Sequence, residues 1–173
     1  VAVHRSIVRH ATALRLTPAV LAHHVMAAAM PDDVQSIDAL CRAAADVGNH
    51  DPHLALTFLE HADALCGPTC VRQVEVALRR AGALCVLHRV TDAIAGLDRA
   101  LEVAVTTEAI GQLRSARARC LRLLGDVVGA SDEFELLAAS GILAPTDEAA
   151  AWADVATYRM WAMQGLRPWQ EAN

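Results

Sequence analysis

The sequence predicts an all-α fold, and three observations support this prediction. Hydrophobic residues make up 54% of the 173 residues but aromatic residues only 3%, and alanine, which has the highest intrinsic helix propensity, is abundant. Helix-capping residues and glycines alternate along the chain. The apolar residues between them recur at helical spacing. These signals predict about nine helices, at residues 3–15, 18–30, 33–47, 52–65, 70–87, 91–104, 107–124, 129–140 and 146–164.

Each predicted helix has start and stop signals of its own. Thr17 and Asp51 each precede a proline, which is the order expected for an N-cap and the first helical residue. The other cap candidates are Asp32 or Asp33, Thr69, Thr91, Thr106 and Thr146. Glycine adopts the left-handed conformation that ends helices without strain. The terminating glycines are Gly48, Gly67, Gly125, Gly141 and Gly165.

One pattern recurs in the second helix of each successive helix pair. Small and large residues alternate at positions i, i+4 and i+7, which lie along one helical face. The small residues let the paired helix approach closely, and the large one fills the gap between pairs. A fifth instance begins at Ala172. The four complete instances are Ala22, Met26, Ala29; Ala55, Leu59, Ala62; Ala93, Leu97, Ala100; and Ala130, Phe134, Leu137.

A helix pair cannot bury its own apolar face, and stacking on the next pair does so. The repeat therefore predicts an α-α superhelix, a solenoid of tetratricopeptide-like antiparallel helix pairs, with residues 1–173 forming a single domain. The clearest repeats are "AGALCVLHRVTDAIAGLDRALEVA" and "ARCLRLLGDVVGASDEFELLAA". A compact helical bundle stays open as the alternative. Because the chain starts at Val1, we expect it to be a fragment of a longer protein.

Charge and composition exclude several functions. The formal net charge is −5, and all 15 basic residues are arginines. Without lysine there is neither a P-loop GxxxxGK(S/T) motif nor a Schiff-base lysine. A mildly acidic chain lacks the basic footprint of a nucleic-acid binder. The longest apolar stretch, near residues 19–30, is too short to span a membrane, and no signal peptide is visible. We expect a cytoplasmic location.

The histidines suggest metal binding but do not have its spacing. His23 and His24 are adjacent in "VLAHHVMAAAM", so on a helix they point about 100° apart and cannot chelate one ion together. We expect one to lie in the seam between helices and the other in solvent. His50 and His53 flank a helix start, where Asp51 already serves as the cap, and we expect both on the surface.

The odd number of cysteines does not suit a secreted disulfide framework and indicates a reducing compartment. One close pair occurs in "CGPTC", where Cys66 and Cys70 flank a Gly-Pro turn. A redox pair, or a metal cluster completed by His61, is one interpretation. The other is two small apolar residues closing a helical corner. The five cysteines are Cys41, Cys66, Cys70, Cys85 and Cys120.

No constellation of catalytic residues is apparent, and we predict no catalytic residue, metal or cofactor. Carboxylates in "PTDEAA" and "SDEFE" fall in predicted first turns, where they complement the helix dipole. There is no nucleophile elbow or dinucleotide fingerprint. A concave surface that binds an anionic or peptide ligand is the remaining prediction, and helix solubility with a core tryptophan is the alternative. Its residues are Gln112, Ser115, Arg119, Arg122, Trp152 and Arg159.

The amino-terminal part resembles a known family. Three short motifs follow one another there: His4-Arg5, then "LAHHVMAA", then "ALCRAAA". This order is similar to that in large ATP-binding LuxR-family transcriptional regulators of actinobacteria, at the junction between ATPase module and tetratricopeptide array. The resemblance implies a sensor segment in which effector or partner binding biases a nucleotide-dependent switch. It also implies that the "AHH" helix belongs to the junction and holds no metal.

Two functional hypotheses follow, together with a weaker metal or redox alternative at Cys66 and Cys70. The first is a non-catalytic sensor and protein-interaction segment of a LuxR-type regulator. The second is a stand-alone tetratricopeptide adaptor that binds a peptide or protein partner. We also expect self-association through apolar residues left partly uncovered near the carboxyl end. These are Trp152, Met160, Trp161 and Met163.

Overall fold

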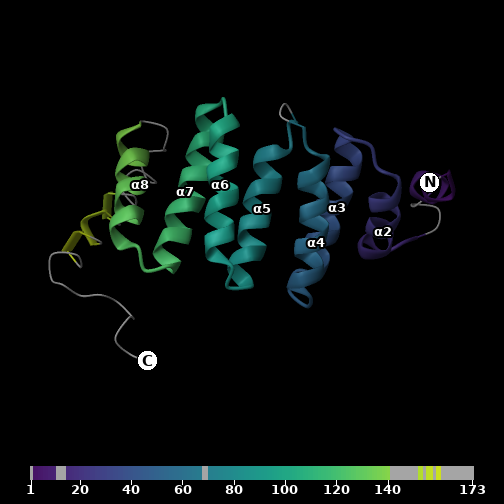
Figure 1. Cartoon of the computed structure of the whole chain (residues 1–173), viewed down its shortest axis with the longest axis horizontal. Coiled ribbons are helices and arrows are strands. Elements are labelled where there is room, and N and C mark those ends of the chain that lie inside the picture. The colour runs from purple at the N-terminus through teal and green to yellow at the C-terminus, as the bar shows by residue number, and fades with distance from the viewer. Residues whose placement is uncertain are drawn as a thin grey trace. The chain divides into compact units, whose positions relative to one another are not determined.

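The structure is a computed structural model that describes residues 2–10, 15–67, 70–140, 152–153, 155–157 and 159–160. Within these residues the fold is all-α and has no strand, as the composition predicts (Figure 1). The described residues between 152 and 160 are also helical. The helices are α1 (Ala2–Arg9), α2 (Pro18–Ala28), α3 (Val34–Val47), α4 (Pro52–Leu65), α5 (Gln73–Val86), α6 (Val90–Val103), α7 (Thr107–Leu123) and α8 (Val127–Ala139).

Several predictions lie wholly or partly outside the described residues. They are the caps Thr69 and Thr146, the glycines Gly141 and Gly165, much of the helix 146–164, and the fifth repeat at Ala172. The predicted helix 3–15 is too long, because α1 ends at Arg9 and Arg15 has a φ of 50°. The other predicted boundaries differ from the observed ones by at most a few residues.

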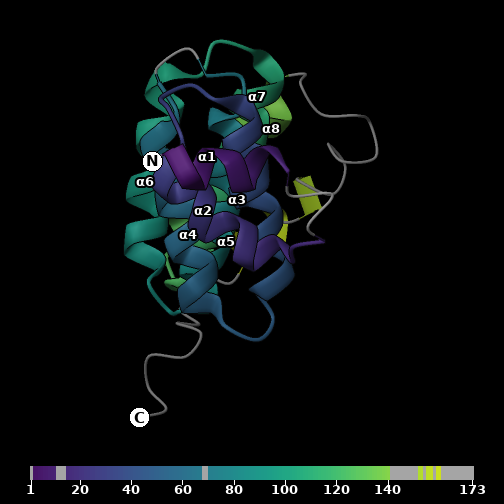
Figure 2. The same cartoon turned by 90° about the vertical axis from the view of Figure 1, so that its right-hand side faces the viewer.

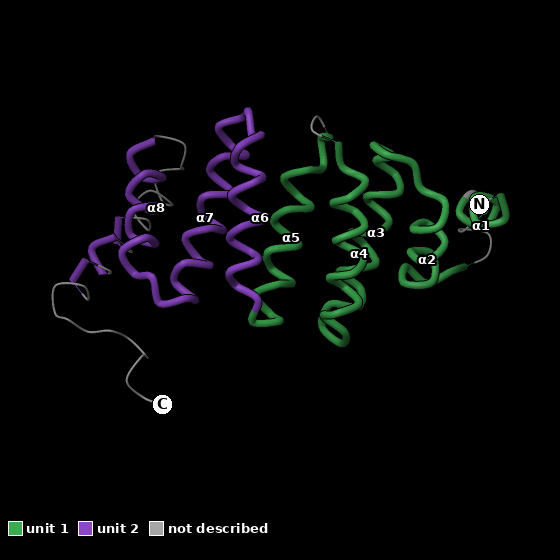
Figure 3. Tube along the Cα trace, viewed as in Figure 1, with its two compact units in different colours: residues 1–88 green, residues 89–173 purple. Residues whose placement is uncertain are grey.

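The chain divides into two compact units, Val1–His88 and Arg89–Asn173 (Figure 3). In the first unit, α1 packs on α2, α2 on α3, α3 on α4 and α4 on α5. Figure 2 shows α1 lying across α2 at the start of this series. In the second unit, α6 packs on α7 and α7 on α8. Packing of consecutive helices is expected for helical-hairpin repeats, whereas a closed bundle also brings distant helices together.

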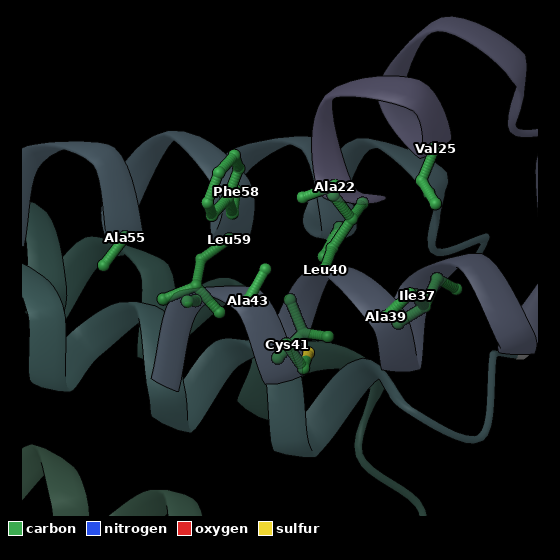
Figure 4. Close-up of a cluster of buried hydrophobic side chains, with 13 residues drawn as sticks. Ala22, Val25, Ile37, Ala39, Leu40, Cys41, Ala43, Ala55, Phe58 and Leu59 are labelled. Carbon is green, nitrogen blue, oxygen red and sulfur yellow. The ribbon is translucent and has the colours of Figure 1, made fainter. Parts of the chain in front are cut away.

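The core of the first unit lies between α2, α3 and α4 (Figure 4). Phe58, Ile37 and Leu40 are fully buried there, and Ala22 and Ala43 fill the spaces beside them. Alanine at these seams lets helix backbones approach, so that the few large side chains can interdigitate. The apolar mass of the sequence therefore goes into close helix packing.

The repeated alanine occupies an equivalent position in three helices. Ala55, Ala93 and Ala130 are each the fourth residue of their helix, and each amide donates to the carbonyl of the N-cap residue at 3.0, 3.1 and 3.0 Å. All three are at most 3% exposed, and Ala22 of α2 is also fully buried. The complete small-large-small pattern is buried in α4 and α6. In α2 and α8 the large members, Met26 and Phe134, are only half-buried.

Most of the predicted caps are confirmed. Their side chains accept hydrogen bonds of 2.9–3.4 Å from backbone amides two or three residues further on. The prediction of Thr91 as a cap is wrong, because α6 begins at Val90. The N-cap residue of α6 is Arg89, and its side chain makes no capping hydrogen bond. Asp126 was not predicted, and it caps α8 by accepting from Gly129 N–H at 2.9 Å. The confirmed caps are Thr17, Asp33, Asp51 and Thr106.

The helix ends follow two mechanisms. Gly125 has a φ of +80° and ends α7 with its amide bonded to the Arg122 carbonyl at 3.0 Å, as predicted for a left-handed terminator. Gly48 ends α3 in the right-handed conformation, so the expectation of a left-handed residue there is wrong. His88 ends α5 with a φ of 57° although it is not a glycine. Its amide donates to the Cys85 carbonyl at 3.0 Å.

We expect His88→Gly to raise the free energy of unfolding by about 0.5–1 kcal/mol, because a left-handed L-residue is strained and glycine is not. Chemical denaturation followed by circular dichroism measures this change. The control is His61→Gly on the exposed face of α4, which should lower stability by about 1 kcal/mol because it puts glycine inside a helix. A loss of stability in both variants would contradict the strained conformation of His88.

A charge network joins α6, α7 and α8 of the second unit. Arg117 of α7 donates to Asp98 of α6 at 2.6 Å and to Glu133 of α8 at 2.7 Å. Arg114 donates to the other oxygen of Glu133 at 3.1 Å. Glu133 is only 8% exposed, so both arginines are needed to compensate its buried charge. The network sets how α6 and α8 are placed against α7.

Candidate binding site

A groove in the first unit is lined by α3, α4 and α5, and we call it the α3–α5 groove. Its volume is about 270 Å³. Two polar side chains, Asn49 and Arg79, line it. The remaining lining is mostly small and apolar, from Cys41, Ala44, Ala45, Gly48, Pro52, Ala55, Leu59, Ala83 and Val86.

The groove exists because the side chains that face it are short. A Cβ added to Gly48 would lie 3.0 Å from the Ala44 carbonyl oxygen and 3.9 Å from the Ala55 Cβ. A side chain at Gly48 would therefore crowd the end of its own helix, α3, but would meet Ala55 of α4 only at an ordinary van der Waals distance. Ala45 is exposed on the groove wall. Its methyl group leaves space that a larger side chain would fill.

Arg79 is the cation of the groove, and it belongs to a row of alternating charges. Its side chain is 44% exposed and lies 3.0 Å from Glu75, one turn earlier on α5. Glu75 also pairs with Arg72 at 3.2 Å, and Arg72 donates to Asp38 of α3 at 3.0 Å. Exposed pairs of this kind contribute little to stability. Arg79 is therefore available to an anionic group that enters the groove beside it.

The size and lining of the groove limit what it can bind. Sites for drug-sized ligands usually exceed about 300 Å³, so this groove suits one large apolar side chain or a similarly small group. The thiol that lines it, Cys41, is 5% exposed. Burial, with a smaller contribution from Glu75, raises the pKa of Cys41 above its ordinary value of 9.0. A buried protonated thiol is a poor nucleophile, so the groove chemistry favours binding.

This pKa shift predicts a loss of stability at alkaline pH. The pKa of this thiol is higher in the folded than in the unfolded protein, so its protonated form favours folding. This stabilisation is complete below the unfolded pKa of 9.0 and is lost as pH rises through the folded pKa. Urea unfolding between pH 8 and pH 10.5 is therefore expected to show a declining free energy, with a shallower decline in Cys41→Ala. Equal slopes in the two proteins would contradict the shift.

The four predicted residues of α7 lie on one face of that helix. Their spacings of three, four and three residues are those of a single helical face. Gln112, Arg119 and Arg122 are exposed, and Ser115 is half-buried. Gln112 donates to Glu108 at 3.4 Å. The exposed Leu123 continues this face at the end of α7. These residues share a surface, and their binding role stays a prediction.

Trp152 and Arg159, the other two predicted residues, lie in the same unit. Trp152 is 42% exposed. Arg159 forms an exposed ion pair with Glu135 of α8. Met160 is 46% exposed, as expected for an uncovered apolar residue, whereas Trp161 and Met163 lie outside the described residues. Self-association through this region stays a prediction.

The adjacent histidines occupy different surroundings, as predicted. His24 is half-buried in the seam with α1, where its Nδ1 hydrogen-bonds His4 Nδ1 at 2.9 Å. His23 is exposed, and its Nδ1 donates to the Ala19 carbonyl at 2.8 Å. Its ring also meets Phe58 edge-on, with the centroids 5.6 Å apart. The two rings therefore contact different helices, His24 at α1 and His23 at α4.

The remaining candidates for metal binding do not form a site in the described part of the chain. His50 and His53 are exposed, as predicted. Within the described residues, no three histidine, cysteine or acidic side chains, including His61, Cys66 and Cys70, form a group that could hold a metal ion. All five cysteines are described and none is in a disulfide.

Two functional features were missed by sequence reasoning. The α3–α5 groove is lined by alanines that look like core alanines in the sequence, so no signal identifies them. Glu133 was interpreted as a first-turn carboxylate in "SDEFE". That interpretation is wrong, because the cap at Asp126 starts α8 at Val127 and places Glu133 two turns into the helix, facing α7.

These features define the chain as an all-α protein of helical-hairpin repeats with a small apolar groove. Comparison with protein-family models, curated proteins and solved structures finds no match to the chain. Among the described residues, no helix has the combined length and hydrophobicity of a membrane span.

Proposed function

We propose that the chain is a non-catalytic recognition module whose α3–α5 groove binds a segment of a partner protein. The observation that carries this proposal is a groove of about 270 Å³ with small apolar walls and one exposed arginine. Burying one large apolar side chain in such a groove contributes about 1.5–3 kcal/mol. An acidic residue beside that side chain would pair with Arg79 and set its orientation.

A peptide library tests the groove directly. Random peptides displayed on phage are selected on the wild-type chain and then tested against Ala45→Trp, which fills the groove, and Arg79→Glu, which reverses its charge. Selected peptides should carry a large apolar residue next to an acidic one and lose binding to both variants. Ala27→Trp on the exposed face of α2 is the matched control and should bind as wild type does. Peptides that bind all four proteins equally would overturn the proposal.

We further propose that this module is the sensor segment of a LuxR-type transcriptional regulator in the cytoplasm. The resemblance of His4-Arg5, "LAHHVMAA" and "ALCRAAA" to that group supports this assignment. In such a regulator, a bound effector or partner biases a nucleotide-dependent switch elsewhere in the same polypeptide. The chain itself then neither hydrolyses ATP nor contacts DNA.

The gene that encodes the chain distinguishes this assignment from its alternative. A P-loop motif upstream and a helix-turn-helix downstream are expected for the regulator. A short intact gene without either would contradict the regulator and favour the stand-alone adaptor. The adaptor would use the same groove, so the peptide experiment tests recognition in both cases.

A further inference from the structure

Two histidines from different helices face each other where α1 packs on α2. The Nδ1 atom of His4 on α1 lies 2.9 Å from the Nδ1 atom of His24 on α2, and the ring centroids are 5.1 Å apart. At this distance the two nitrogens share one hydrogen. One ring donates its Nδ1 proton and the other accepts it at an unprotonated Nδ1, so at least one imidazole is neutral. The contact therefore requires that the pair carry no more than one positive charge.

A second proton on this pair would place two N–H groups opposite each other. Both side chains are half-buried, so water screens two positive charges there only in part. The ion pairs among the described residues include neither histidine. The residue that follows His4 is Arg5, a further cation. The docked arrangement of α1 on α2 therefore opposes the second protonation.

The other titratable groups near the pair do not compensate a second charge. On α1, Arg5 donates to the Met30 sulfur at 3.5 Å. On α2, His23 is exposed and its ring bonds the Ala19 carbonyl of the same helix. The remaining described groups lie at the end of α1 or on α3, which packs on the other side of α2 in the chain order, and no printed hydrogen bond joins them to either ring. They are His10, Asp33, Asp38, Arg42 and Asp46.

The helical state of α1 depends on its docking. It spans eight residues, and a helix this short is not stable in water by itself. Its main packing partner is α2. Val8 of α1 packs against the core of the first unit. Arg5 and Val8 also form one wall of a cavity of about 450 Å³, whose other walls come from α2 and the start of α3.

We propose that the His4–His24 pair is a pH-sensitive switch that keeps α1 docked on α2 at neutral pH and releases it in acid. Histidine is the side chain that ordinarily changes charge between pH 5 and 8. Above this range the pair shares one hydrogen and α1 stays docked. Below it each ring holds a proton, the hydrogen bond is lost and the two imidazolium groups repel each other. Release removes one wall of the cavity and uncovers the core at Val8.

Hydrogen exchange of the whole chain, followed by mass spectrometry at pH 7.5 and pH 5.0, tests the proposal. Each rate is divided by the intrinsic rate of the unfolded sequence at the same pH, which gives a protection factor. The amides of α1 should be protected at pH 7.5. Their protection should fall about tenfold or more at pH 5.0, because like charges at contact distance near a protein surface change an equilibrium by about that factor. The amides of α3 should keep their protection at both pH values.

Substitutions at the two rings separate the switch from general effects of acid. The amide of asparagine can take the place of Nδ1 in a hydrogen bond but does not titrate. His4→Asn and His24→Asn should therefore keep α1 equally protected at both pH values. His4→Asp should reverse the response, because a carboxylate there pairs with protonated His24. His23→Asn, next to His24 on α2, is the matched control and should respond as wild type does.

The wild-type comparison needs no variant and can overturn the proposal by itself. Equal protection of α1 at pH 7.5 and pH 5.0 would do so. A loss in α3 as large as that in α1 would also do so, because it would show unfolding of the whole unit. A wild-type response in both His4→Asn and His24→Asn would show that other groups cause the release. The pair lies outside the α3–α5 groove, so these results do not depend on what that groove binds.

Discussion

Replacing Phe58 with alanine is expected to lower the free energy of unfolding of the first unit by about 4 kcal/mol, among the larger effects of a single substitution. Among the described residues, Phe58 is the largest fully buried side chain, and it is 0% exposed. Its removal leaves a cavity between α2 and α4 and also removes the edge-on contact with His23. Urea denaturation followed by far-ultraviolet circular dichroism measures the change.

Tryptophan fluorescence can be recorded in the same denaturation to follow the second unit separately. The three tryptophans, Trp152, Trp161 and Trp169, all belong to the second unit, so their fluorescence follows that unit. The control is Glu60→Ala on the exposed face of α4, which should change stability by less than about 0.5 kcal/mol. If Phe58→Ala cost less than about 1 kcal/mol, the burial of Phe58 in the core formed by α2, α3 and α4 would be contradicted.

Replacing Glu133 with glutamine should lower the free energy of unfolding of the second unit by about 2 kcal/mol. Glutamine keeps the shape of the side chain but removes the charge that Arg114 and Arg117 share. The side chains of these arginines are 34% and 27% exposed, so water compensates only part of the loss and the effect is smaller than for a fully buried pair. Tryptophan fluorescence during urea denaturation follows this unit.

The same helix supplies a matched control for Glu133. Glu135 pairs with Arg159, and its side chain is 39% exposed, so Glu135→Gln should cost between about 0 and 1 kcal/mol. The difference between the two variants isolates the contribution of the buried network. Equal losses in Glu133→Gln and Glu135→Gln would show that the network does not hold α6, α7 and α8 together.

The helices could be predicted from the sequence because their signals are local. Thr17, Asp51 and Thr106 cap the amides of their own first turns, so the residues that decide a helix start lie within a few positions of it. His88 shows the limit of this reasoning. It takes the left-handed position that glycine usually holds, and without a glycine as signal the end of α5 and the start of α6 were each misplaced by one residue.

The candidate site could be predicted only in part, because it depends on contacts between distant segments. The face of α7 that carries Arg119 and Arg122 follows from helical periodicity alone. The α3–α5 groove does not, because Ala45 and Ala43 look alike in the sequence and only packing leaves one exposed on the groove and buries the other. The pairing of Glu133 with Arg117 likewise joins two helices, and no local pattern specifies it.

The central claim is that successive hairpins bury one equivalent alanine, and a set of alanine-to-leucine substitutions tests it most directly. Ala55, Ala93 and Ala130 are buried, whereas Ala64 and Ala95 are exposed on α4 and α6. The added carbon atoms should cost about 2 kcal/mol of unfolding free energy at each buried position and less than about 0.5 kcal/mol at each exposed one. If leucine were tolerated equally at Ala93 and Ala95, close packing of the hairpins through these alanines would be contradicted.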